Sequence, residues 1–278
     1  MFVVGPATEY FIAGSWHSSP PHSFAAEWVR HFADGEILSD SGPLWFCLVL
    51  LGFSLCFAGY HRLLPALPTD RIGRMPSVAA VLGYAAAMTT VTFSVGVIAP
   101  RGGTILNVDV HDFPQYPLMF AAGVMAWRHD WPRYIPHQTG GEWLVGGLIV
   151  SGLLWLLLIT QGGALDGDLS AYGGGWHWQA AGMAIWRSFT CLSLSLGLVT
   201  LYRDHFDGQG PVTGFLTRSA FGVYVFHAPI LIAITRVLHD WPADVAVKFF
   251  TASMVGIAAT FLFVGLIARR TPGLRAIV

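Results

Sequence analysis

Two side chains able to exchange protons or hydrogen bonds stand three residues apart, at Tyr224 and His227. Residues three apart on an α-helix share a face, so the phenol and the imidazole are expected on the same side. Pro229 crowds the carbonyl of Val225 and leaves it free to accept a hydrogen bond nearby. A histidine that removes a proton from an attacking hydroxyl gives a rate gain of about a hundred- to ten-thousand-fold. The spacing therefore predicts a functional site; the alternative is a neutral histidine bonded to a neighbouring helix.

An arginine stands in the middle of another apolar stretch, at Arg187 between Trp186 and Ser188. An unpaired guanidinium is costly inside a membrane, so it needs an anion. That anion is either a phosphate of a substrate or a carboxylate from a helix outside this sequence. The structural alternative is that Arg187 pairs with a nearby group of this chain and that water enters the membrane around it, without a role in function.

A short polar stretch holds Asp109, His111 and Asp112. Carboxylates and imidazole are ligands that suit zinc, but the stretch lacks a third partner at a suitable spacing. We therefore expect a solvated loop here and predict no metal site.

The elements that must position these groups are set by the composition of the chain. Of the 278 residues, 54% are hydrophobic and only 11% are charged, and the mean hydropathy is +0.57. A soluble domain has about a quarter of its residues charged. Lipid must therefore surround most of this protein. The formal net charge of -1 gives no indication of nucleic-acid binding.

A helix that spans the bilayer needs about 20 apolar residues, because the hydrocarbon core is about 30 Å thick. Six runs meet or approach that length: Pro43 to Tyr60, Ser77 to Ala99, Glu142 to Thr160, Gln179 to Tyr202, Ser219 to Leu238 and Asp244 to Ala268. A seventh run, Gln115 to Trp127, is short and needs local thinning of the bilayer. The prediction is an all-α, polytopic membrane bundle of about seven transmembrane helices.

Arginines alternate between rich and poor connections, as the positive-inside rule requires, provided that all seven helices span. The rich connections hold Arg62, Arg71 and Arg74, then Arg128 and Arg133, then Arg203 and Arg218, and the tail holds Arg269, Arg270 and Arg275; the poor ones hold Arg30, Arg101 or none. This pattern places residues 1–42 outside as an extracytoplasmic loop, makes 43–278 one membrane domain and leaves the C-terminus in the cytoplasm. An outside N-terminus without a signal peptide indicates that preceding helices are missing from this sequence.

The topology also gives the depth of His227. It lies about nine residues, or roughly 13 Å, from the cytoplasmic edge of its helix. An ionisable residue at that depth is a functional candidate by default.

Four motifs resemble the bacterial acyltransferase 3 family. SAFGVYVFHAPIL, from Ser219, resembles its C-terminal signature, with Phe221 where tyrosine is frequent. GPLWFCLVLLGFSLCFA from Gly42, FPQYPLMFAAGVMAWRHDWPRYIP from Phe113 and the ending ARRTPGLRAIV are similar to a helix start, a short helix with a basic loop, and the closing segment of that family. The resemblance covers residue 42 to the end.

The resemblance implies a ten-helix enzyme of the bacterial inner membrane with both termini inside. Such enzymes transfer an acyl group, commonly acetyl from acetyl-CoA, to a hydroxyl of a carbohydrate or lipid-like acceptor. The family carries an arginine and a histidine about ten residues apart on its first helix, the histidine being the presumed base. That helix is not found before Gly42, where Arg30 and His31 are adjacent in a polar loop. The chain thus resembles the last seven helices of such an enzyme.

The resemblance also suggests roles for individual residues. His227 and Tyr224 are expected to line or organise the active cavity. The residues assigned to binding are Trp45 and Gln115, which match motifs of the family, Arg128 for its positive charge, and Arg187, which matches no position of the family pattern. Acyl-CoA is expected as the donor substrate, with no bound cofactor. For Trp45, Arg128 and Gln115 the structural alternatives are an interface anchor, a marker of the cytoplasmic edge and a residue at a helix start. The expected partners are the bilayer, acyl-CoA and a carbohydrate or lipid-linked acceptor.

Two other classes of protein stay open. One is a non-catalytic remnant that binds a partner or ligand without turnover. The other is a small transporter, which the number of helices permits. No pair of interrupted helices stands at matching positions of two halves, so the inverted repeat of many transporters is not indicated.

Overall fold

The computed structural model describes residues 29, 44–63, 75–101, 104–105, 108–167, 169–206, 208, 210–272 and 274. The helices are α4 (Trp45–Leu63), α5 (Val78–Ile98), α6 (Gln115–Arg128), α7 (Trp131–Tyr134), α8 (His137–Gln161), α9 (Trp178–His205), α10 (Pro211–Val237) and α11 (Val245–Phe263), which continues as a π-helix, η6 (Val264–Ala268). Between them lie two 3₁₀ turns, η4 (Ala164–Asp166) and η5 (Ser170–Tyr172), and a two-stranded antiparallel ribbon of β1 (Thr104–Ile105) and β2 (Val108–Asp109). The predicted all-α membrane bundle is confirmed. Apart from Val29, the predicted loop 1–42 lies outside the described residues.

Six of the described helices are long and apolar enough to cross a bilayer: α4, α5, α8, α9, α10 and α11 with η6. They correspond to the six long runs of the sequence. Helix α6 coincides with the seventh run but has only 14 residues, which gives a length of roughly 21 Å. That length is short of the hydrocarbon core, so a crossing by α6 stays a prediction.

Large apolar side chains face outward along these helices. On α8, Leu148, Ile149 and Leu153 are exposed by 54%, 57% and 62%. Contiguous apolar surface of this kind is rare on soluble monomers, whereas lipid is its natural solvent.

The described chain divides into two compact units. We call residues 51–207 the central unit, and residues 1–50 with 208–278 the flanking unit. Helices α5, α6, α7, α8 and α9 belong to the central unit, and α10, α11 and η6 belong to the flanking unit. The start of α4 lies in the flanking unit and the rest of α4 in the central unit.

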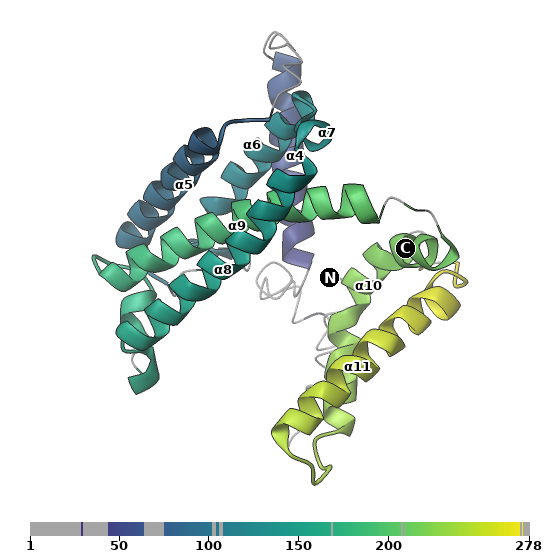
Figure 1. Ribbon diagram of the computed structural model, residues 1–278. Helices are drawn as coiled ribbons and strands as arrows, with labels where there is room; N and C mark the ends of the chain where they lie inside the picture. Colours follow the sequence, from purple (N-terminus) through teal and green to yellow (C-terminus); the bar gives the residue numbers. More distant parts are fainter. Residues whose placement is uncertain are drawn as a thin grey trace. The chain divides into compact units, whose positions relative to one another are not determined.

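In the central unit, α9 packs against both α8 and α5 (Figure 1). Glycine allows the close approach of α8 and α9. A Cβ atom at Gly147 would lie 2.6 Å from the Cβ of Ser193, and one at Gly197 would lie 2.5 Å from the Cβ of Leu144. Small residues let helix backbones approach closely in membranes, where packing rather than hydrophobic burial drives association.

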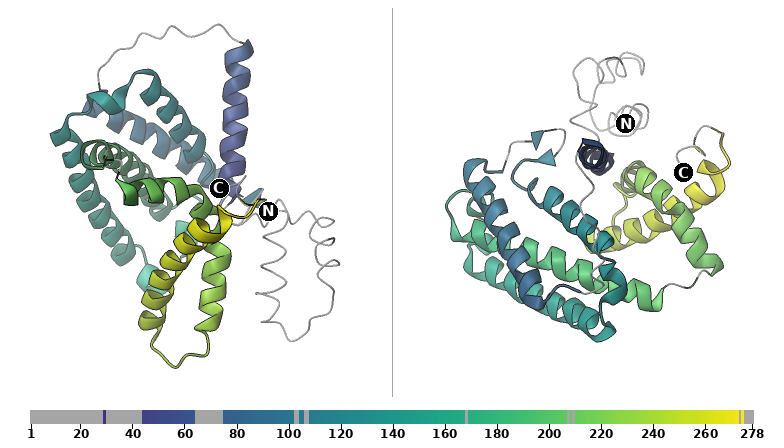
Figure 2. Two further views of the ribbon diagram at one scale, coloured as in Figure 1. Left: turned by 90° about the vertical axis from the view of Figure 1, so that its right-hand side faces the viewer. Right: turned by 90° about the horizontal axis from the view of Figure 1, so that it is seen from above.

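In the flanking unit, α10 and α11 form an antiparallel hairpin, which Figure 2 shows from two further sides. Its core joins Val225 and Phe226 of α10 to Val264 and Ala268 of η6. The side chain of Asp244 caps the start of α11 by accepting a hydrogen bond from the backbone N–H of Ala246 at 2.8 Å.

Candidate functional site

The histidine of α10 is held in one orientation by its own helix. The Nδ1 atom of His227 lies 2.7 Å from the backbone oxygen of Tyr224. A carbonyl oxygen only accepts hydrogen bonds, so Nδ1 carries the proton of the neutral ring. Nε2 is then the nitrogen with the free lone pair. An imidazole in this state can accept a hydrogen bond or a proton from a hydroxyl group.

This imidazole stands at the end of a row of aromatic rings. The ring of Tyr224 lies 6.2 Å from that of His227 and 6.5 Å from that of Phe46, at the start of α4. Phe46 in turn packs edge-on against Trp45 at 6.1 Å. Three residues singled out in the sequence (Trp45, Tyr224 and His227) thus stand in one row of rings within the flanking unit. Phe46 was not predicted, although it is the residue next to Trp45 in the motif.

The opposite side of α10 anchors this row. Val225 and Phe226 are buried, with exposed fractions of 9% and 7%. The ring of Phe226 packs edge-on against Phe263 at 5.2 Å. Because these positions lie across the helix from Tyr224 and His227, their burial fixes the rotation of α10 and hence the direction of the functional face.

The arginine of α9 finds its anion within the chain. The guanidinium of Arg187 donates to the carboxylate of Asp112, which precedes α6. Arg101 also donates to Asp112, at 3.3 Å, and lies 3.7 Å from Asp109. The side chain of Arg187 is only 13% exposed. The pairing therefore meets the cost of burying a charge locally, and a role of Arg187 in binding a substrate stays a prediction.

The stretch around His111 is not the solvated loop that the sequence suggested. The side chain of His111 is 4% exposed and packs on Gly96, where an added Cβ atom would lie 2.4 Å from its Cε1. Burial lowers the pKa of His111, and this effect exceeds the opposing one of Asp112. Its Nδ1 atom has no hydrogen-bond partner among the described residues. Sequence reasoning missed this burial because a glycine on another helix makes the room.

Metal ligation finds no support in the described part of the chain, where no group of three or more His, Cys, Asp or Glu side chains is placed to hold an ion. The carboxylates nearest His111 are instead occupied by Arg101 and Arg187.

The two remaining predicted residues lie at opposite ends of α6. Gln115 is its first residue and donates from its backbone N–H to the oxygen of Asp112 at 3.2 Å, as a residue at a helix start does. Arg128 is its last residue, where a cation complements the helix dipole. The structure thus places Gln115, Arg128 and Arg187 in the central unit, and it places Trp45, Tyr224 and His227 in the flanking unit.

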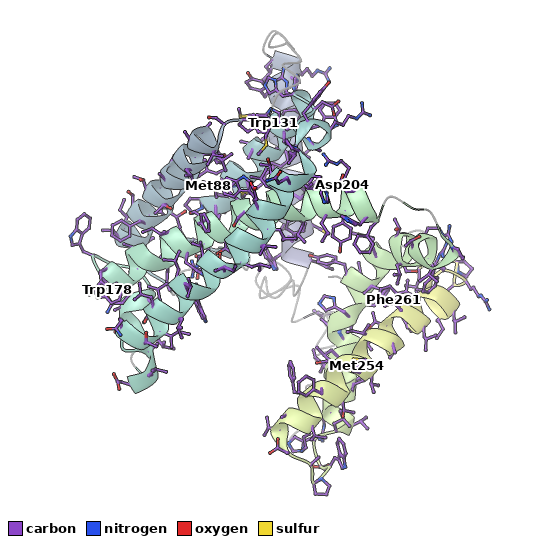
Figure 3. The ribbon with its side chains drawn as sticks, in the orientation of Figure 1. Met88, Trp131, Trp178, Asp204, Met254 and Phe261 are labelled. Atoms are coloured by element: carbon purple, nitrogen blue, oxygen red, sulfur yellow. The ribbon has the colours of Figure 1, made fainter. Side chains whose placement is uncertain are left out.

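A polar network at the end of α9 was not predicted. Arg203 donates from Nη1 to the backbone oxygens of Pro132 and Ile135, at 2.6 and 2.9 Å. The carboxylate of Asp204 lies 2.8 Å from Nδ1 of His137. Figure 3 shows Asp204 at one end of α9 and Trp178 at the other. The network ties α7 and the start of α8 to α9.

The helices and the intramembrane histidine define the class of protein: a multi-pass helical membrane protein with a polar group inside a span. A family model described as an acyltransferase domain, acyltransferase 3, matches residues 4–269, so the chain belongs to this family of membrane acyltransferases. The match begins at residue 4, well before the motif at Gly42. No curated protein and no solved structure matches the chain.

Proposed function

We propose that this chain transfers an acyl group, acetyl in the first instance, from an acyl-CoA to a hydroxyl group of a carbohydrate or lipid-like acceptor. The observation that carries the proposal is the orientation of His227, whose Nδ1 is held by a carbonyl so that Nε2 is left to accept a proton. Membership of the acyltransferase family supplies the class of reaction.

The chemistry requires a base. The hydroxyl oxygen attacks the thioester carbonyl carbon, the new C–O bond forms, the C–S bond breaks and the thiolate of CoA leaves. The proton of the hydroxyl passes to a base and then to the thiolate, so the reaction needs no further reagent. In this proposal His227 accepts a hydrogen bond from the acceptor hydroxyl at Nε2, and the rings of Tyr224 and Phe46 stand in the same row beside it.

The proposal includes a location. Membership of the family favours a bacterial inner membrane, and the alternation of arginines favours a C-terminus in the cytoplasm. Acyl-CoA is a cytoplasmic donor, and the arginine-rich connections on that side attract its phosphates. The acceptor reaches the site from the lipid or from the other side.

The test is acyl transfer from radiolabelled acetyl-CoA in membranes that contain the full chain. We expect His227→Ala to lower turnover by about a hundredfold or more, because a positioned histidine contributes at least that much. His239→Ala is the matched control, since this histidine lies in the connection between α10 and α11 and is 64% exposed. It should leave turnover unchanged.

Folding of each variant is checked by its thermal melt in detergent. Full turnover by a folded His227→Ala protein contradicts the proposed role of His227. Absence of transfer by the wild-type chain to any extracted acceptor favours the non-catalytic alternative.

A further inference from the structure

The central unit contains a cavity of about 520 Å³ between α5, α6, α7 and α9. Its walls are almost wholly apolar and include Met119, Leu192 and Val199. The volume falls within the range of about 300–1,000 Å³ that is usual for ligand pockets. None of the six site residues predicted from the sequence lines the cavity; its walls belong to the central unit, whereas His227 belongs to the flanking unit.

The two side-chain hydroxyl groups of the cavity wall are already used. The hydroxyl of Tyr84 donates to the backbone oxygen of Leu118 at 2.6 Å, and that of Ser195 donates to the backbone oxygen of Cys191 at 2.7 Å. A polar ligand would lose its hydrogen bonds to water here and find few replacements. The occupant that suits such walls is a hydrocarbon chain.

Positive charge gathers at one end of the cavity. Arg128 follows the lining residue Ala126 on α6, and Arg133 adjoins the lining residue Pro132. Arg203 donates to the carbonyls of Pro132 and Ile135, which also belong to the wall. Among the described residues at that end, the three arginines carry one more charge than the two aspartates, of which Asp130 pairs with Arg133 at 3.3 Å and Asp204 pairs with Arg203 at 2.5 Å. Arg133 remains 80% exposed.

We propose that this cavity binds one acyl chain of an anionic phospholipid, whose headgroup lies against Arg128 and Arg133. Basic pockets between membrane helices are known to hold anionic headgroups. Transfer of a chain from the bilayer gains little hydrophobic free energy, because lipid tails are as apolar as the cavity wall. Selection among lipids must therefore come from the headgroup charge. The site goes beyond the proposed acyl transfer and does not depend on it.

Trp131, which Figure 3 labels, offers a direct readout, because this residue lines the cavity and lies next to Pro132 and Arg133. The full chain is reconstituted with phosphatidylglycerol brominated on its acyl chains, which quench indole fluorescence on contact. The contribution of Trp131 is the difference between the wild-type chain and Trp131→Phe. We expect brominated phosphatidylglycerol to quench the fluorescence of Trp131, obtained from this difference, at a lower mole fraction than brominated phosphatidylcholine does.

A matched pair of glycine variants tests whether the acyl chain of the lipid binds in this cavity. Gly123 lines the cavity, and a Cβ atom added there meets no atom within 4 Å. Gly123→Leu should fill the space without disturbing the helices and abolish the quenching of the Trp131 signal. Gly152→Leu on α8 is the control. A Cβ atom added at Gly152 also meets no atom within 4 Å, but Gly152 does not line the cavity.

The headgroup is tested with Arg133→Gln, which should weaken phosphatidylglycerol binding about fivefold, the effect of one basic residue at a membrane surface. Equal quenching by the two lipids would show that the site does not select an anionic headgroup. Quenching of Trp131 that persists in Gly123→Leu would show that the acyl chain of the lipid does not bind in the cavity. If either leucine variant fails to fold, displacement of brominated lipid from the wild-type chain by about one equivalent of unbrominated phosphatidylglycerol decides instead.

Discussion

Among single side chains, His111 shows how burial makes a group sensitive to pH. Its folded pKa lies below the ordinary value of 6.5, with burial and the nearby Arg187 and Arg101 opposing protonation and Asp112 and Asp109 favouring it. As the pH falls, the unfolded chain takes up this proton before the folded chain does. The contribution of His111 to stability is therefore complete above about pH 6.5 and is lost progressively as the pH falls from there through the lower pKa of the folded chain.

We expect the melting temperature of the purified chain to drop between pH 7.5 and 5.5, and the drop to be smaller in His111→Gln. The amide of glutamine does not titrate, so the variant removes the proton uptake without adding a charge. An identical pH profile for the two proteins would show that His111 is not held neutral by the fold.

A second side chain carries an unmet hydrogen bond. Thr92 on α5 is 1% exposed, and its hydroxyl has no partner among the described residues. Valine has the same shape without the hydroxyl, so Thr92→Val should raise the free energy of unfolding by about 1 kcal/mol. Thr200 on α9 is also buried but donates to the backbone oxygen of Leu196 at 2.9 Å.

Thr200→Val is therefore the control, and we expect it to be neutral or destabilising by about 1 kcal/mol. Chemical denaturation of both variants in the same detergent measures the difference. A loss of stability in Thr92→Val would mean that its hydroxyl has a partner such as a buried water molecule.

At the scale of the helices, glycine at particular positions of α8 allows the close packing of α8 and α9. Gly147 of α8 faces Ser193 of α9, whereas Gly152 of the same helix faces open space. Gly147→Ala should push the helices apart and cost about 1–3 kcal/mol, as overpacking usually does. Gly152→Ala should stabilise the helix by up to about 1 kcal/mol, because alanine is the better helix former. The two unfolding midpoints, compared with that of the wild-type chain, test the assignment of the α8–α9 contact.

Apolar runs predicted the helices and most of their starts, but they missed the starts of α8 and α10. The run on α8 starts at Glu142, while the helix starts at His137, and the run on α10 starts at Ser219, while the helix starts at Pro211. Hydropathy reports only the part of a helix that faces lipid. Helix α8 begins with the polar stretch HQTGG, and α10 begins with the mixed stretch PVTGFLTR, opened by a proline at its first position.

The candidate site was predictable to a different degree. The shared face of Tyr224 and His227 follows from helical spacing alone. The partner of Arg187 does not, because Asp112 stands 75 residues earlier and no local pattern joins the two. The carbonyl that orients His227 was also missed, because the sequence offered Pro229 and the carbonyl of Val225 instead.

The orientation of the whole chain in the bilayer is the prediction on which the location of donor and acceptor depends. Tyr134 at the end of α7 is 51% exposed and lies beside Arg133, in a connection expected inside. Leu165 in η4 is 72% exposed and lies in a connection without arginine, expected outside. Single cysteines at these positions, in a chain whose Cys47, Cys56 and Cys191 are replaced by serine, report the two sides separately.

We expect a membrane-impermeant maleimide to label Leu165→Cys in intact cells and to label Tyr134→Cys only after lysis, because arginine-rich connections resist export. Labelling of both in intact cells would mean that α8 does not span, although it is long and apolar enough to do so. The reverse pattern would place the C-terminus outside. The arginines beside the apolar cavity would then face the outer leaflet, and the donor side of the proposed reaction would be reversed with them.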